Sequence, residues 1–255
     1  MKILFTVCGR AGSKGLRNKN LKTFLGDPLM YYTLSCIDLF KKRNSNRFHI
    51  DIAINSDSQD LLKLAGETNL DILQIRRVEE LGKDDTPKVS VIRNSLEMAE
   101  KEKGYGYDII VDLDITSPLR TIIDLENAVN KKIENTSTDV VFSVVEARRN
   151  PYFNMVKNEN GVVSKVISSN FVARQQAPEV YDMNASIYVY AKAFLINNDV
   201  RTVFDGKIDI VKMTDTAILD IDSENDFELM EIMAEYLYKT YPKFKDIKDN
   251  IKSIV

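Results

Sequence analysis

The chain opens with a short apolar run that leads into a basic, glycine-rich loop, Ile3-Leu4-Phe5-Thr6-Val7-Cys8 followed by Gly9-Arg10-Ala11-Gly12-Ser13-Lys14-Gly15-Leu16-Arg17-Asn18-Lys19-Asn20. A continuous apolar run of this length predicts a buried strand. The three glycines of the loop allow backbone N–H groups to turn toward a ligand, and Lys14 and Lys19 add positive charge. The next acidic residue is Asp27, although the whole chain has a formal net charge of -3. We therefore expect a local positive pocket for a small molecule that carries phosphate.

Strands and helices alternate after this loop. A helix is expected from Pro28, and a third strand at 71–75 leads to Arg76-Arg77. Further expected elements are a strand at 48–54, a helix capped by 55–57, a helix from Pro87 and an apolar strand at 108–114. This rhythm predicts an α/β fold with a doubly wound, mostly parallel, Rossmann-like sheet, which binds ligands beyond the carboxyl ends of its strands. We expect the glycine loop, Arg76-Arg77 and the pair Asp112 and Asp114 to meet at that edge.

The alternation stops near residue 146. Turn signals follow, and Asn160-Gly161 predicts a hairpin between 153–156 and 162–167. We interpret 146–182 as a small arm inserted into one domain that spans 1–255. The chain is expected to rejoin the sheet at 186–190, and Ser223 to cap a final amphipathic helix.

Composition excludes several classes of protein. The 255 residues are 44% hydrophobic and 29% charged, as in ordinary globular proteins. A sequence pI of about 5.4 argues against a nucleic-acid-binding surface. No apolar run is long enough for a membrane span and no signal peptide precedes the first strand, so we expect a cytoplasmic protein without a membrane partner. Cys8 and Cys36 are expected to be reduced core residues.

The loop spacing is G-x-x-G-x-x-G, which fits neither the dinucleotide fingerprint nor the P-loop, because Lys14 is followed by Gly15. It indicates phosphate binding but also fits an ordinary glycine turn. A single histidine, His49, effectively excludes a Ser-His-Asp triad or a zinc–histidine site.

Two carboxylate pairs, Asp220 with Asp222 and Asp112 with Asp114, have the i, i+2 spacing that places both side chains on one face of an extended segment. Such a pair suits Mg²⁺, which takes one or two protein carboxylates beside phosphate oxygens and water. A solvated turn or a helix cap is the alternative interpretation. Arg174-Gln175-Gln176 is either a basic surface turn or a clamp for a carboxylate.

Several motifs occur together and in order: the glycine loop with Lys19-Asn20, Thr116-Ser117-Pro118-Leu119-Arg120, Arg174-Gln175-Gln176-Ala177-Pro178, Asn184-Ala185-Ser186-Ile187-Tyr188 and Asp220-Ile221-Asp222. In these motifs, over nearly its whole length, the chain resembles the nonulosonic-acid cytidylyltransferases, the CMP-sialic acid synthetase family. The resemblance implies that CTP and a nine-carbon α-keto sugar acid give a CMP-sugar and pyrophosphate with Mg²⁺. It also implies a homodimer, with 146–182 as the dimerisation and sugar-binding arm.

The resemblance assigns roles to individual residues. Arg10, Lys14 and Lys19 would act on the triphosphate, and Asp220 and Asp222 would hold the metal. Asp222 is in addition a candidate base for the hydroxyl proton. Expected substrate-binding residues are Ala11, Gly12, Ser13, Asn20, Arg76, Asp114, Thr116, Ser117, Arg120, Tyr152, Phe153, Arg174, Gln175 and Asn184, with Arg174 on the sugar carboxylate.

Departures from the sialic pattern concern the sugar. Asp114-Ile115 stands where many sialic enzymes have Gln-Pro, and Tyr152 and Phe153 suggest a less polar pocket. These segments look most like bacterial CMP-legionaminic acid synthetases, so we expect N,N'-diacetyllegionaminate as the acceptor. Asp114 is also a candidate for the metal shell. The alternatives are N-acetylneuraminate as the acceptor, a sugar-1-phosphate nucleotidyltransferase, or a non-catalytic regulator that binds nucleotide.

Overall fold

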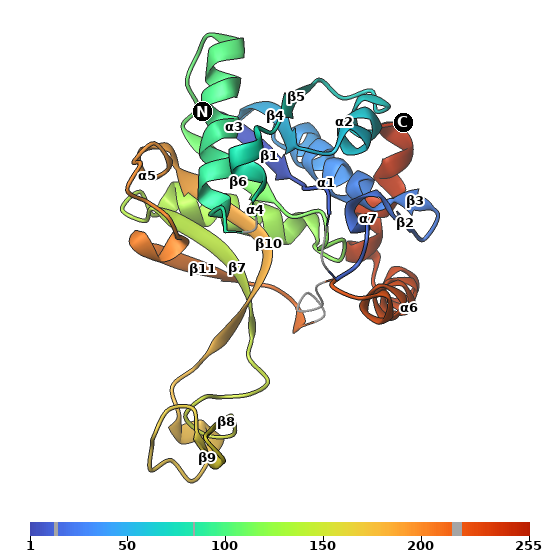
Figure 1. Ribbon diagram of the computed structural model, residues 1–255. Coiled ribbons are helices and arrows are strands. Elements are labelled where there is room, and N and C mark those ends of the chain that lie inside the picture. Colours follow the sequence, from blue (N-terminus) through green and yellow to red (C-terminus); the bar gives the residue numbers. More distant parts are fainter. Residues whose placement is uncertain (13–14, 84, 216–220) are drawn as a thin grey trace.

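A computed structural model describes residues 1–255 except 13, 14, 84 and 216–220. Its centre is a seven-stranded sheet in the order β11-β7-β10-β6-β1-β4-β5 (Figure 1). The strands are β1 (Lys2–Cys8), β4 (His49–Ser56), β5 (Ile72–Arg76), β6 (Ile109–Leu113), β7 (Val140–Glu146), β10 (Tyr181–Ala191) and β11 (Ile208–Lys212). All neighbouring pairs are parallel except those that β10 makes with β6 and β7. The predicted doubly wound, mostly parallel sheet is confirmed.

Helices cover both faces of the sheet (Figure 1). They are α1 (Leu29–Arg43), α2 (Gln59–Gly66), α3 (Lys88–Lys103), α4 (Ile122–Glu134), α5 (Lys192–Leu195), α6 (Glu224–Thr240) and α7 (Pro242–Asn250). β1 is buried between its two end residues, and its side chains alternate between two cores. Ile3 and Phe5 pack with residues of α1, α2, α4, α6 and α7, whereas Leu4 packs with residues of α3 and α5.

The local expectations hold with three corrections. α2 is capped by Ser58, whose side chain accepts from Leu61 N at 3.2 Å, rather than by 55–57. The return strand β10 starts at Tyr181, five residues before the predicted start. Ser223 caps α6 in a capping box with Asp226, as expected, but α7 follows, so α6 is not the final helix. No helix in the described ranges is long and apolar enough to cross a membrane.

The inserted segment projects from the ends of β7 and β10 (Figure 1). Its hairpin joins β8 (Val156–Glu159) to β9 (Val162–Lys165), as the sequence predicted, although β8 starts three residues later than expected and β9 ends two residues earlier. Asn160 and Gly161 have φ values of 55° and 86°, the positive pair that a tight hairpin turn requires. A second small hairpin, β2 (Thr23–Phe24) with β3 (Asp27–Pro28), follows the glycine loop.

Candidate active site

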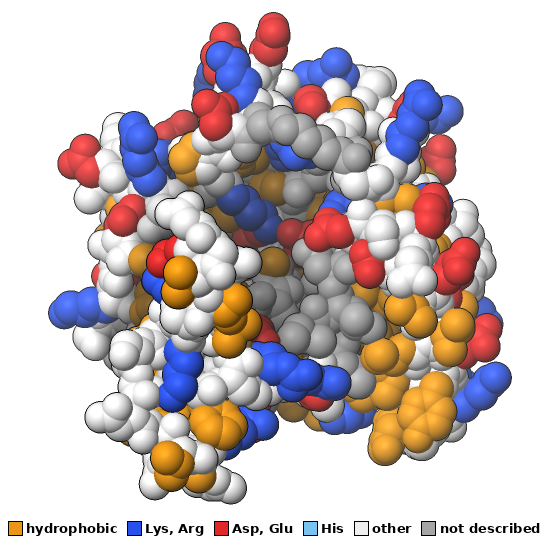
Figure 2. Space-filling view, turned by 60° about the horizontal axis from the view of Figure 1, so that its bottom comes forward, with side chains coloured by type: hydrophobic (Ala, Val, Ile, Leu, Met, Phe, Trp, Pro, Cys, Tyr) orange, Lys and Arg blue, Asp and Glu red, His pale blue; other side chains and the backbone are white. Residues whose placement is uncertain are grey.

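A cavity of about 290 Å³ lies at the carboxyl edge of the parallel strands. The face that carries it is hollowed, and Lys and Arg side chains lie in the hollow (Figure 2). The described lining residues are Cys8, Arg10, Lys19, Asn20, Arg77, Leu81, Lys83, Thr86, Lys88, Val91, Asp114 and Thr116. Five of these are cationic and one is a carboxylate. This charge, where a doubly wound sheet binds its ligands, suits a polyanion such as a triphosphate.

The glycine loop contacts the segment at Ile221 and Asp222, about 200 residues later in the chain. Lys19 Nζ donates to Ile221 O at 2.9 Å and lies 3.1 Å from Asp222 Oδ1. A Cβ added at Gly15 would lie 2.1 Å from Asp222 O, so only glycine permits this approach. The structure thus brings Lys19 and Asp222 together, as the resemblance implied. Ser13, Lys14 and Asp220 lie outside the described residues.

Two further hydrogen bonds hold described residues of the glycine loop. Ala11 N donates to Asp57 Oδ1 at 2.7 Å, beyond the end of β4. Asn20 Nδ2 donates to Arg10 O at 3.3 Å, which closes the loop on itself. Gly12 has a φ of 73°, which favours glycine. Arg10 and Asn20, which this hydrogen bond joins, both line the cavity.

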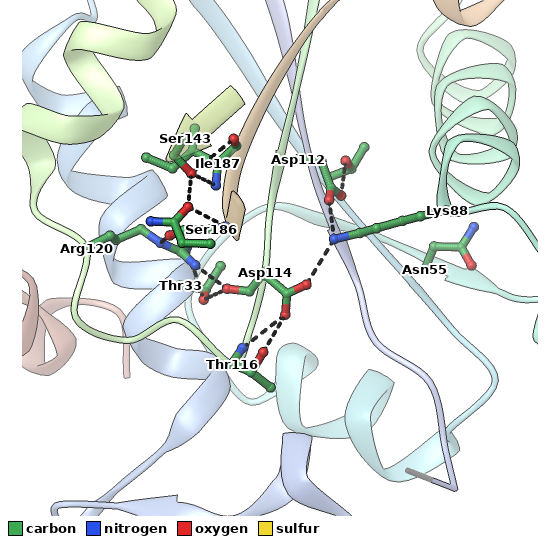
Figure 3. Close-up of polar contacts among 12 residues, drawn as sticks. Thr33, Asn55, Lys88, Asp112, Asp114, Thr116, Arg120, Ser143, Ser186 and Ile187 are labelled. Atoms are coloured by element: carbon green, nitrogen blue, oxygen red, sulfur yellow. Dashed lines mark hydrogen bonds and ion pairs between the residues drawn. The ribbon is translucent and has the colours of Figure 1, made fainter. Parts of the chain in front are cut away.

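Lys88, Asp112 and Asp114 form a charged cluster in the cavity wall (Figure 3). Lys88 Nζ lies 2.9 Å from Oδ2 of each aspartate. Burial works against the charge of Lys88, but the two carboxylates outweigh it and raise the pKa of the ammonium well above its usual range. Asp112 and Asp114, which the sequence offered as a possible metal-binding pair, thus bind the Lys88 ammonium. This ammonium occupies the position between the carboxylates that a metal ion bound by both would take.

The two aspartates of the cluster differ in their access to the cavity. Asp112 is fully buried on β6, and its Oδ1 accepts from Thr6 Oγ1 at 2.7 Å. Asp114 lines the cavity, with Thr116 N and Thr116 Oγ1 donating to its Oδ1 at 3.1 and 2.9 Å. Burial would raise the pKa of Asp114, but Lys88 and Thr116 lower it well below its usual range. Asp114 therefore presents an ionised carboxylate to the cavity.

Arg77, rather than the predicted Arg76, lines this cavity. Arg77 is buried and donates from Nε to Asn55 Oδ1 at 3.0 Å and from Nη2 to Asn55 O at 2.8 Å. Arg76 is exposed, and its Nη1 donates to Gln59 Oε1 at 2.7 Å. Adjacent residues at a strand end face opposite sides. The sequence alone does not show which side meets the cavity, so it could not tell which arginine lines it. Its patterns also missed Lys83 and Lys88, which belong to no motif.

The residues of the motif after β6, 116–120, differ in whether they line the cavity or pack inside the protein. Thr116, Ser117 and Arg120 are all buried, and of the three Thr116 alone lines the cavity. Arg120 donates from Nε to Ser186 Oγ at 3.1 Å and from Nη2 to Asp114 O, which ties the motif to β10. Asn184 is likewise buried, and its Oδ1 accepts from Ser143 Oγ at 2.6 Å. The substrate-binding roles of Ser117, Arg120 and Asn184 stay predictions, because these hydrogen bonds join parts of the protein to one another.

The arm residues lie apart from this cavity in the single chain. Arg174 and Gln175 line a second cavity of about 420 Å³ at the base of the arm, where Arg174 Nη2 donates to Ala147 O at 2.9 Å. The Tyr152 ring packs against that of Phe171 at 6.2 Å between centroids. Tyr152 and Phe153 are half-buried in the arm and line neither cavity. One chain does not join the predicted sugar residues to the cationic cavity.

The two cysteines differ in their surroundings. Cys36 is a buried free cysteine, as predicted, but Cys8 is half-buried and lines the cavity at the end of β1. Burial and the nearby Asp112 raise the pKa of the Cys8 thiol.

The described part of the chain holds no group of three His, Cys, Asp or Glu side chains suited to a metal. Asp222, with 73% of its side chain exposed beside Lys19, has the hard oxygens that Mg²⁺ takes together with phosphate oxygens.

A doubly wound sheet with a cationic cavity at its carboxyl edge defines the class of nucleotide-binding α/β proteins. The family model described as cytidylyltransferase matches residues 4–247, and the chain belongs to this family of nucleotidyltransferases.

Two curated relatives and one solved structure extend this result. Post-translational flagellin modification protein B of Campylobacter coli is 34% identical over 234 residues, which cover 92% of this chain and 95% of the relative. CMP-N,N'-diacetyllegionaminic acid synthase of Campylobacter jejuni subsp. jejuni serotype O:2 is 35% identical over 232 residues, with 91% and 94% covered. The structure of CMP:2-keto-3-deoxy-manno-octonic acid synthetase complexed with CTP has a TM-score of 0.63 at 13% identity, covering 93% of this chain and all of that one. At this identity the last match shows the fold alone.

Proposed function

We propose that the protein transfers CMP from CTP to the anomeric hydroxyl of N,N'-diacetyllegionaminate, with release of pyrophosphate. The observation that carries this proposal is the cavity lined by five cationic side chains at the carboxyl edge of the sheet. The legionaminic acid synthase relative, similar over nearly the full length of both chains, supports the choice of sugar. N-acetylneuraminate is the alternative acceptor.

The reaction needs in-line positioning of the hydroxyl and neutralisation of the charge on the phosphates. Arg10, Lys19, Arg77 and Lys83 line one cavity and would bind the triphosphate and the leaving pyrophosphate. No covalent nucleophile is required for this substitution. Mg²⁺, held by Asp222 and the neighbouring Asp220, would supply additional positive charge at the phosphates.

The inserted arm, 146–182, supports a homodimer. Its described surface exposes apolar side chains, namely Met155, Val156, Val162, Val163 and Val172. An apolar surface of this kind is typical of an interface between chains. We propose that the arm packs on a second copy and brings Arg174, Tyr152 and Phe153 of one chain to the sugar in the other. Because CTP is the co-substrate, this proposal places the protein in the cytoplasm.

The test is an acceptor panel with CTP and Mg²⁺, with pyrophosphate release as the readout. The panel contains N,N'-diacetyllegionaminate, N-acetylneuraminate, an eight-carbon α-keto sugar acid and sugar 1-phosphates. We expect the highest kcat/KM with the legionaminate. Preference for N-acetylneuraminate would refute the sugar assignment, and turnover of sugar 1-phosphates alone would refute the acceptor class. CTP binding without turnover of any acceptor would instead indicate a regulator.

A further inference from the structure

The Lys88–Asp112–Asp114 cluster gives a net charge of -1 to one part of a cavity wall that is otherwise positive. A phosphate group would be repelled by that charge and, when fully ionised, carries no hydrogen-bond donor. This part of the wall is therefore suited to a ligand group that donates a hydrogen bond. Sugar hydroxyl and amide N–H groups are donors of this kind.

Asp114 has one hydrogen-bond position left for such a donor. A carboxylate offers about four acceptor sites. Thr116 N, Thr116 Oγ1 and Lys88 Nζ use three of them, at distances between 2.9 and 3.1 Å. Because 26% of the Asp114 side chain is exposed and the residue lines the cavity, a ligand can reach the remaining site.

Lys88 in turn has a fixed position. It is the first residue of α3, and its ammonium is shared with Asp112, which is fully buried and held by Thr6. The Lys88 Nζ atom also lies 5.5 Å from the centre of the Tyr188 ring on β10. Lys88 thus connects Asp114 to the rigid centre of the sheet.

The side of the cavity on which Asp114 lies indicates which substrate it contacts. Asp114 follows β6, and its backbone N donates to Ser186 O of β10 at 3.2 Å. β10 and β7 carry the arm, whereas Arg77 follows β5 at the opposite edge of the sheet. The phosphate-binding loop after β1 lies between these two sides. Asp114 therefore lies on the β10 side of the cavity, away from Arg77, and this side is left for the acceptor sugar when the triphosphate occupies the cationic side.

We propose that Lys88 is a positioning residue that holds the Asp114 carboxylate toward the cavity, where Asp114 accepts a hydrogen bond from a hydroxyl or amide N–H of the acceptor sugar. This inference rests on the proposed function, because it assigns a contact to the acceptor of that reaction. Lys88 acts through Asp114 and makes no contact of its own with the sugar.

The experiment compares three variants of the full chain with the wild type. Lys88→Met with Asp112→Asn removes the ammonium without leaving a buried carboxylate uncompensated, and the Asn can still accept from Thr6. Asp114→Asn removes the charge but keeps an oxygen for Thr116. The third variant combines all three substitutions. The control is Lys131→Met with Asp209→Asn, which breaks a lysine–aspartate pair of the same 2.9 Å length on α4 and β11, away from the residues that line the cavity. Thermal melts establish that each variant is folded.

We expect Lys88→Met/Asp112→Asn and Asp114→Asn each to raise KM for the sugar about tenfold, the usual effect of losing a hydrogen bond to a charged group, while KM for CTP changes less than about twofold. The triple variant should be no worse than Asp114→Asn, because effects that act through one residue do not multiply. Multiplying effects, an unchanged KM for the sugar, or a rise confined to CTP would each overturn the inference. Absence of CMP-sugar formation by the wild type would instead refute the proposed function.

Discussion

Gly15→Ala should strongly reduce the activity of the protein without unfolding it. The added Cβ would lie 2.1 Å from Asp222 O, whereas ordinary contacts between carbon and oxygen begin near 3.4 Å. Because the contacting atom belongs to the backbone, the glycine loop and the segment at Asp222 must separate by about 1.3 Å. Lys19, which now contacts both Ile221 and Asp222, would lose its position at the cavity wall.

A displacement of about 1 Å in a catalytic arrangement can cost roughly 100-fold in rate, and we expect a loss of this size in kcat/KM for CTP. The unfolding free energy should fall by less than about 1 kcal/mol, because Gly15 lies on the surface, outside both cores. The assay is pyrophosphate release with varied CTP, together with chemical denaturation.

Gly66→Ala is the matched control. Its Cβ would lie 2.7 Å from Gln74 Nε2, the free end of a flexible side chain that can move away. This variant should keep wild-type kinetics, and alanine should suit the end of α2 better than glycine. Wild-type kcat/KM in Gly15→Ala would refute the idea that contact between the loop and Asp222 organises the site.

Further predictions concern the cavity, the arm and the charged cluster. Arg77→Met should raise KM for CTP more than Arg76→Met, because only Arg77 lines the cavity; equal effects in steady-state kinetics would contradict this assignment. Val162→Lys with Val163→Lys should convert a dimer to a monomer in light scattering and abolish sugar turnover while CTP binding is retained; an unchanged mass would remove the arm from the interface. The pKa of Asp114 is lowered in the folded protein, so its stabilising effect should be complete above its unfolded pKa of about 3.9 and be lost as the pH falls further. Chemical denaturation of the wild type and of Asp114→Asn should therefore give a difference in unfolding free energy that is constant from pH 8 to 5 and smaller below pH 4. A difference that already declines near pH 6 would contradict the lowered pKa.

The sequence predicted the elements that local patterns define. The apolar run at 3–8, the cap at Ser223 and the Asn160-Gly161 turn each have a short-range cause, and the structure confirms all three. The direction of β10 was beyond these patterns, because strand direction depends on how the chain returns from the arm.

The sequence predicted those site residues that lie at the end of a strand or in the loop directly after one. Asp114 was found because it ends an apolar strand, and Lys19 because it lies in the glycine loop. Lys88 could not be found in this way, because it starts a helix and reaches Asp112 and Asp114 only through the packing of α3 on β1 and β4. Arg77 was not distinguished from its neighbour Arg76, because adjacent residues at a strand end face opposite sides and the sequence does not show which side meets the cavity.

The central claim is that this chain forms a phosphodiester between CMP and a nonulosonate. Phosphorus NMR of the reaction with CTP, Mg²⁺ and N,N'-diacetyllegionaminate tests it most directly. We expect the three CTP resonances to be replaced by one phosphodiester resonance and one of pyrophosphate, at a higher rate than with N-acetylneuraminate. Unchanged CTP resonances, or pyrophosphate with free CMP as the only other product, would contradict it.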